Sequence, residues 1–302
     1  MYHLATLFPE VRRIKLPFTR DQLMMLMMAI NLVFLGLDIY LAHSANGTIV
    51  PYEWIPIIFG PVAGVLLLVS GLIAQRNRPL ATMIATLTLL VSTLVGLVGA
   101  YLHLVRGALP TAPIGERLTI DLLVWAPPVL GPLMFAIVGV FGLSAVWVEN
   151  PPDSGILVML GGSRLQLPYS KTRAYFLIVA MASMITVLSS VLDHARLQFE
   201  NPWLWLPTIV GVFGTVVALA LGMVEVPSRN DLLTYLITMA ALIIVGVVGA
   251  VLHTQADLTA GGTFVLERFL RGAPFLAPML FANVGMIGLI VLLDPQETLP
   301  AA

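Results

Sequence analysis

The chain has 302 residues, of which 59% are hydrophobic and 10% charged, with a formal net charge of −1 and a mean hydropathy of +0.97. A soluble domain carries about 25% charged residues, so this chain lacks the polar groups needed to cover a water-facing surface. The near-zero charge excludes a strongly basic nucleic-acid-binding protein. The absence of cysteine excludes disulfides, thiolate metal sites, iron–sulfur clusters and c-type haem attachment.

The first twenty residues, MYHLATLFPEVRRIKLPFTR, do not have the pattern of a secretory signal. They lack a leading basic segment followed by an apolar core and a cleavage site of small residues. We therefore expect residues 1–20 to form a cytoplasmic or interfacial segment before the first span.

Long apolar runs follow, and about 20 such residues are needed to cross roughly 30 Å of hydrocarbon as a helix. Helices are expected because every backbone amide must be satisfied within the segment when water is absent. The sequence predicts an all-α integral membrane protein with eight transmembrane helices, at 21–43, 53–75, 79–105, 119–147, 172–197, 203–226, 231–255 and 265–293.

The distribution of lysine and arginine predicts the orientation of these spans. With the N-terminus inside, ten basic residues fall on the cytoplasmic side and five on the outer side, as the positive-inside rule favours. Eight spans then return the C-terminus to the inside. We expect both termini to be cytoplasmic and the membrane to be the cell membrane.

Several motifs occur twice, in the same order and at nearly the same spacing. VGLVGAYLHL matches VGVVGAVLHT at seven of ten positions, and two longer stretches also align without gaps. The aligned pairs are 43–56 with 194–207, 95–104 with 245–254, and 121–143 with 267–289. This pattern predicts a tandem duplication of a four-helix unit. Because four is even, the repeats are parallel and related by an axis along the membrane normal.

The duplication suggests a division of the chain into five parts. We predict an N-terminal segment at 1–20 and two four-helix repeats at 21–148 and 172–293. A cytoplasmic linker at 149–171 joins the repeats, and a cytoplasmic tail follows at 294–302.

Ionisable groups are absent from the middle of the predicted spans and gather near the outer ends. Each half supplies two histidines and an acid: His43, His103 and Asp121 in the first, and His194, His253 and Glu267 in the second. Two imidazoles and a carboxylate at one depth can bind copper, iron or zinc. A pair of imidazoles on facing helices can instead hold a b-type haem. Both cofactors stay open, as does the alternative that these groups are solvated residues at the interface with no ligand.

Further residues support such a site. Glycines stand four and seven positions before each late histidine, on its own helix face, and allow a helix or flat cofactor to approach closely. Glu53 and Asp193 lie nearby in sequence, without acidic counterparts in the other half. The supporting glycines are Gly96, Gly99, Gly246 and Gly249.

Prolines four residues apart lie near the start of the fourth and eighth predicted spans: Pro128 and Pro132 in one, Pro274 and Pro278 in the other. Each proline removes an amide donor and frees a carbonyl, which kinks or breaks a helix. The break either shapes an outer pocket or serves helix packing alone.

Three functions fit these features. The first is a metal- or haem-binding membrane protein, the second a small-solute transporter or channel with a path between the halves, and the third a structural or assembly subunit. The lack of charge at mid-membrane counts against proton-coupled transport, and no phosphate-binding loop indicates a nucleotide site. We expect the lipid bilayer, other membrane subunits or further copies of the chain as partners, and no nucleic acid. The sequence favours a protein without enzyme activity over an enzyme.

Overall fold

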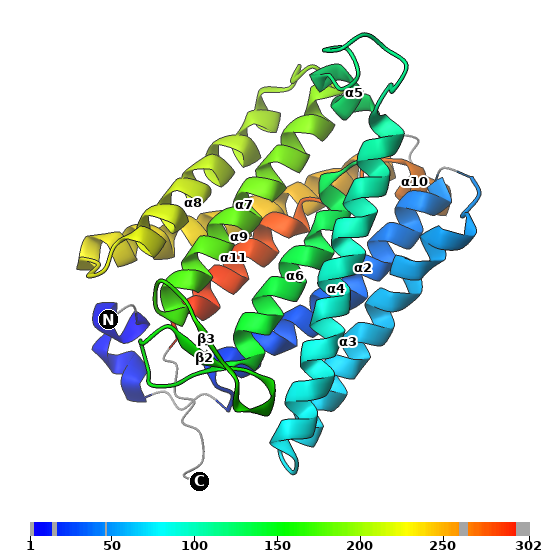
Figure 1. The fold of residues 1–302 in the computed structure, drawn as a ribbon. Coiled ribbons are helices and arrows are strands. Elements are labelled where there is room, and N and C mark those ends of the chain that lie inside the picture. The colour runs from blue at the N-terminus through cyan, green and yellow to red at the C-terminus, as the bar shows by residue number, and fades with distance from the viewer. Residues whose placement is uncertain (1–2, 14–16, 46, 260–264, 294–302) are drawn as a thin grey trace.

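The computed structural model describes residues 3–13, 17–45, 47–259 and 265–293; the predicted tail, 294–302, lies outside these residues. Long helices dominate the molecule and run between its two ends (Figure 1). Six of the described helices are long and apolar enough to cross a membrane, which makes the chain a polytopic membrane protein. They are α2 (Arg20–Ala45), α3 (Trp54–Ala74), α4 (Arg78–Gly107), α7 (Lys171–Ala195), α8 (Trp205–Met223) and α9 (Arg229–Thr259).

The regions predicted as the fourth and eighth spans are not continuous helices. Range 119–147 contains α5 (Ile120–Trp125) and α6 (Leu130–Val146), and range 265–293 contains α10 (Leu266–Arg271) and α11 (Met279–Val291). The interruptions fall at the prolines, which supply no amide to continue the helical hydrogen bonds. Each of the two ranges therefore contains two helices with proline between them, and neither is one of the six long apolar helices. At 1.5 Å per residue, the 13 residues of α11 reach only about 20 Å.

Small residues bring neighbouring helices into close contact. A Cβ atom added to Gly60 of α3 would lie 2.5 Å from the Leu32 carbonyl oxygen, and one added to Gly36 of α2 would lie 2.5 Å from Pro61 Cδ. Such distances leave no room for a side chain, so α2 and α3 pack with their backbones nearly touching. Small residues at interfaces are typical of membrane helices, where packing must replace the hydrophobic effect.

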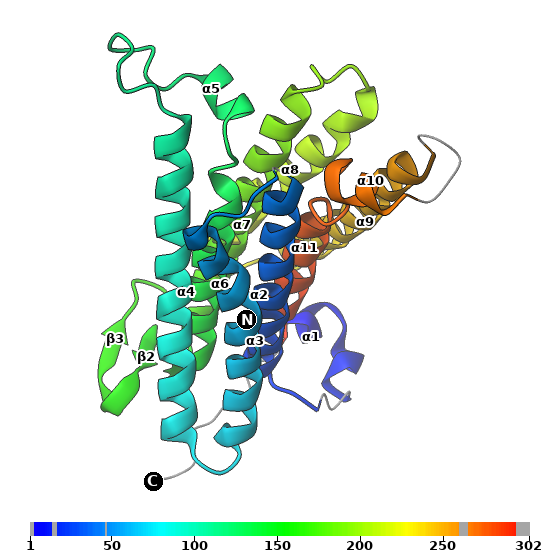
Figure 2. The same cartoon turned by 90° about the vertical axis from the view of Figure 1, so that its right-hand side faces the viewer.

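The centre of the molecule is formed by α2, α6, α7 and α11. Contacts run from α2 to α6, from α6 to α7, from α7 to α11 and from α11 back to α2. The rings of Phe141 on α6 and Tyr175 on α7 stack at 6.2 Å, and both side chains are almost fully buried. Residues 20–146 and 171–291 therefore meet through the first and last helices of each half, while α3, α4, α8 and α9 lie outside them (Figure 2).

The segment between the halves contains a small antiparallel sheet that the sequence did not reveal. Strand β2 (Ile156–Val158) pairs with β1 (Val148–Glu149) on one side and with β3 (Arg164–Gln166) on the other. Glu149 joins this sheet to α7, because its carboxylate accepts hydrogen bonds from the amides of Gly155 and Lys171. Strands of two or three residues carry too little alternation to be recognised in a sequence.

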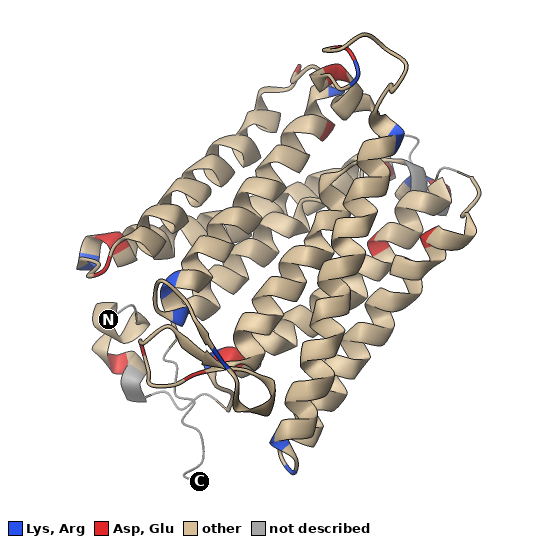
Figure 3. Ribbon diagram, in the orientation of Figure 1, with Lys and Arg blue, Asp and Glu red and all other residues tan. Residues whose placement is uncertain are grey.

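Short elements complete the described chain: helix α1 (Leu4–Leu7) and the 3₁₀ turns η1 (Pro9–Arg13), η2 (Pro51–Glu53), η3 (Leu160–Gly162) and η4 (Pro202–Leu204). The Leu4 amide donates to the Leu292 carbonyl at 2.8 Å, which ties the start of the described chain to the end of α11. Charged residues lie mainly towards the two ends of the long helices (Figure 3). We call these ends the histidine end and the Arg20 end.

Candidate functional site

His103, near the end of α4, hydrogen-bonds to backbone across the helix interface. Its Nδ1 atom lies 3.0 Å from the carbonyl oxygen of Pro128, in the interruption between α5 and α6. Because a carbonyl oxygen can only accept, Nδ1 carries the proton and donates it. The Nε2 atom of the neutral ring then keeps a free lone pair.

His253 makes the same bond in the second half. Its Nδ1 atom lies 3.1 Å from the carbonyl oxygen of Pro274, in the interruption between α10 and α11. The two late histidines therefore share one tautomer and one type of partner, and each contacts the last helical segment of its own half.

The prolines explain why these carbonyls need a donor. In a continuous helix the carbonyl of Pro128 would accept from residue 132, and that of Pro274 from residue 278, but both of those residues are proline. Each carbonyl accepts a shorter-range bond from Gly131 or Ala277 and uses its second lone pair for the histidine. The carbonyl that each helix interruption leaves without its usual donor is therefore the one that the late histidine contacts.

The glycines before each histidine allow this close approach. A Cβ atom on Gly96 would lie 2.4 Å from the Ala136 amide nitrogen, and one on Gly246 would lie 2.4 Å from the Ala282 amide nitrogen. Gly99 and Gly249 face the rings of Pro132 and Pro278, with Cβ positions 2.8 Å from the proline Cβ atoms. The segment that approaches these glycines is the start of α6 in the first half and of α11 in the second.

In the first half, His43 and Glu53 gather around His103. The ring centroids of His43 and His103 are 6.1 Å apart, and the buried Nδ1 atom of His43 has no hydrogen-bond partner among the described residues. Glu53, from the turn before α3, has a side chain only 12% exposed, and its carboxylate lies 3.8 Å from the Arg106 guanidinium. Two imidazoles and one acid are therefore close together at the end of this half.

The second half has a related but different arrangement. His194 lies within electrostatic range of His253, and its Nδ1 atom is 3.4 Å from the Ser190 hydroxyl. Asp193 lies within electrostatic range of His253 and 4.0 Å from Arg196. The acid nearest the histidines thus comes from α7 here and from the turn before α3 in the first half.

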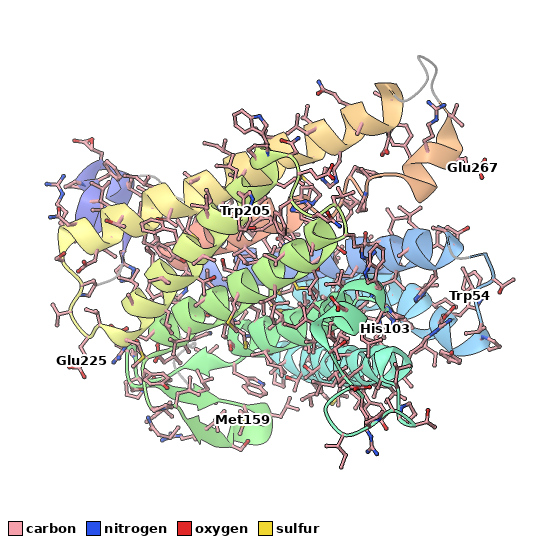
Figure 4. All side chains as sticks on the ribbon, turned by 90° about the horizontal axis from the view of Figure 1, so that it is seen from above. Trp54, His103, Met159, Trp205, Glu225 and Glu267 are labelled. Atoms are coloured by element: carbon pink, nitrogen blue, oxygen red, sulfur yellow. The ribbon has the colours of Figure 1, made fainter. Side chains whose placement is uncertain are left out.

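The acids predicted for the site at the start of spans four and eight are in a different environment. The side chains of Asp121 and Glu267 are exposed, and Figure 4 shows Glu267 on α10 at the edge of the molecule. Within the described ranges, no three His, Cys, Asp or Glu side chains are grouped so that they could hold a metal ion. Among the described residues, neither Asp121 nor Glu267 forms such a group with the histidines.

At the Arg20 end the structure reveals a buried ionic cluster that the sequence pattern does not indicate, because Arg20 and Lys171 stand in the sequence as loop charges. The side chains of Arg20 and Lys171 are 1% exposed. Lys171 Nζ donates to Asp21 Oδ2 and, at 2.8 Å, to the Trp147 carbonyl. The Tyr175 hydroxyl donates to Asp21 Oδ1 at 3.0 Å.

The cluster joins the first helices of the two halves. Arg20 NH1 donates to Thr172 Oγ1 at 2.7 Å, while Lys171 reaches Asp21 in the opposite direction. With the offset of 151 residues that aligns 43–56 with 194–207, Arg20 corresponds to Lys171 and Asp21 to Thr172. Each cation therefore binds the residue directly after the aligned cation of the other half: Arg20 binds Thr172, and Lys171 binds Asp21. Only an alignment extended to the helix starts shows this relationship.

No protein-family model, curated protein or solved structure matches this chain. Its function must therefore be inferred from the side chains and their contacts.

Proposed function

We propose that this chain crosses the cell membrane eight times, as two parallel four-helix units derived from a tandem duplication, with both termini cytoplasmic. Each unit carries a two-histidine site for a transition-metal ion near its outer end. The order α2, α3, α4, α5, α6 recurs as α7, α8, α9, α10, α11, and the histidine–proline bonds recur with it. Both observations support a common origin of the halves.

The observation that carries the metal proposal is the bond from Nδ1 of each late histidine to a backbone carbonyl. Histidines that bind metals nearly always donate the other ring N–H to a carbonyl or carboxylate, which sets the tautomer and makes the free nitrogen more basic. His103 and His253 have this carbonyl partner, with Nε2 free to bind an ion.

The residue types select the class of metal. Neutral imidazole suits copper, zinc, iron and nickel, and affinity among divalent ions peaks at copper. With two protein imidazoles, water or a bound substrate completes the coordination. The first unit binds more tightly, because its rings are 6.1 Å apart and the Glu53 carboxylate, 12% exposed, adds negative charge nearby.

Metal binding to the purified, chelator-treated chain tests this proposal. Titration with Cu²⁺ and Zn²⁺, followed by equilibrium dialysis and metal analysis, is expected to show saturable binding that His103→Gln and His43→Gln weaken by at least about tenfold. His3→Gln is the matched control, because the fifth histidine lies before α1, far along the chain from either site, and is expected to leave binding unchanged.

The outcomes separate the alternatives. Equal binding by wild type and His103→Gln would overturn the metal site. A Soret band in the protein as purified, lost in the same variants, would assign the histidine pair to a b-type haem instead.

We also propose that the chain works with other membrane subunits or further copies of itself. Two imidazoles with open coordination positions need a partner that delivers a substrate or electrons. Native mass spectrometry of the protein extracted in lipid nanodiscs is expected to detect an assembly, and a monomer with full metal binding would contradict this.

A further inference from the structure

A small cavity of about 70 Å³ lies between α2 of the first half and the interrupted α10–α11 segment of the second. On α2 it is lined by Asp38, Leu41 and Ala42, which share one helix face because they are three and four positions apart. Figures 1 and 2 show α10 beside the end of α2. The cavity therefore lies between the halves; among the described residues no histidine lines it, and it shares Pro274 with the His253 contact.

Asp38 is the only charged residue among the lining residues. It lies seven residues before the end of α2, about 10 Å along the helix, and so within the apolar span. Among the described residues its carboxylate has neither a hydrogen bond nor an ion pair of its own. An ionisable group in a membrane helix is costly without a partner, and such groups commonly mark ligand or ion sites.

The corresponding contact between α7 and the α5–α6 segment contains a cation from the protein itself, Arg196. There, Arg196, directly after α7, donates to the carbonyl oxygens of Val124, at 2.7 Å in α5, and of Ala126, at 3.4 Å just after α5. The alignment of 43–56 with 194–207 pairs Arg196 with Ala45. The α2 side has no such arginine and presents the Asp38 carboxylate instead.

The rest of the cavity wall is aromatic and apolar. Phe269 and Phe275 line it together with Pro274, and the two phenyl rings are 6.3 Å apart and nearly perpendicular. A carboxylate beside aromatic rings is the combination with which proteins recognise alkylammonium groups, because the ring faces attract positive charge.

We infer that this cavity binds a small monovalent ammonium-type cation between the two halves, with Asp38 as the counter-ion and the phenyl rings as cation–π partners. A volume of about 70 Å³ is enough for a ligand of a few non-hydrogen atoms. Ammonium and methylammonium fit this description.

The charges around Asp38 favour a cation. Asp193, on α7, lies within electrostatic range of Asp38, so two carboxylates act on this region. Arg196 and His253 also act on Asp193 and moderate its charge, which leaves Asp38 as the principal anion of the cavity. A site between the halves is also where the transport alternative places its path.

Binding of methylammonium to the full chain in nanodiscs, followed by calorimetry, tests this inference. Asp38→Asn keeps the size of the side chain and removes its charge, and is expected to weaken binding by at least about tenfold. Phe275→Leu keeps an apolar wall without a ring and is expected to weaken binding about threefold to tenfold. Glu116→Gln is the matched control, because it removes a carboxylate from an exposed loop.

Two results would overturn the inference: unchanged methylammonium binding by Asp38→Asn, or equal competition by Na⁺ and K⁺, which would point to a simple alkali-cation site. Copper titration of the same variants separates this site from the histidine pairs, since Asp38→Asn is expected to leave metal binding intact. A melting temperature close to that of the wild type, measured for each variant, distinguishes lost binding from lost folding.

Discussion

The guanidinium of Arg20 donates a 2.7 Å hydrogen bond to the hydroxyl of Thr172, a residue 152 positions away that begins the second half. Both residues are 1% exposed, so this bond joins the halves inside the molecule. A buried donor that loses its partner costs more than the bond itself contributes, because the guanidinium has already lost its water.

Thr172→Val keeps the shape of the side chain and removes the hydroxyl. We expect it to lower the free energy of unfolding by about 1–3 kcal/mol, because Arg20 NH1 loses its acceptor inside the protein. Thr119→Val would lose a hydrogen bond to the Leu122 amide that is longer, at 3.2 Å, and lies at a half-buried helix start. This variant is expected to lose less stability. Unfolding in mixed micelles measures both, and equal losses would show that the bond between the halves has no special weight.

The histidine–proline bond makes a reciprocal prediction. His103→Ala removes the donor to the Pro128 carbonyl and is expected to destabilise the protein by about 1 kcal/mol. Pro132→Ala supplies an amide four residues after that carbonyl, so the double variant should lose less stability than the sum of the single losses. If the stability losses of His103→Ala and Pro132→Ala simply add in the double variant, the His103 bond does not compensate for the missing amide donor to the Pro128 carbonyl.

Replacement of Gly96, at the contact between α4 and α6, is expected to cause a steric clash, and Gly71 provides a matched control. Gly96→Ala places a Cβ atom 2.4 Å from the Ala136 amide nitrogen, whereas at Gly71 nothing lies within 4 Å of the added atom. We expect Gly96→Ala to lower the melting temperature through a loss of about 1–3 kcal/mol, and Gly71→Ala to preserve or raise it, because alanine is the better helix former. Similar melting temperatures for the two variants would contradict the close approach of α4 to α6.

The proposed orientation predicts which loops react with an impermeant thiol reagent in intact cells. A single cysteine introduced at Thr111, between α4 and α5, should react from outside, while one at Asn77, between α3 and α4, should not. The chain has no native cysteine to interfere. Labelling at position 77 without permeabilisation would contradict the proposed orientation and indicate the opposite one.

Composition and periodic motifs were sufficient to predict a membrane protein built from long apolar helices, because the thickness of a bilayer imposes one length on every span. They also located the late histidines, their glycines and the paired prolines, since each depends on local spacing along one helix. The interruptions in the ranges 119–147 and 265–293 follow from the missing proline amides, although the sequence alone did not show how far each gap extends.

Only the tertiary structure decided which groups meet. Asp121 and Glu267 occupy matching positions in the aligned stretches 121–143 and 267–289, yet both are exposed, whereas Glu53 lies near His43 and His103. The partner of each late histidine proved to be a backbone carbonyl, which no side-chain pattern records. The ionic cluster of Arg20, Asp21 and Lys171 depends on two helices about 150 residues apart beginning at the same place, and such convergence is set by packing and not by local sequence.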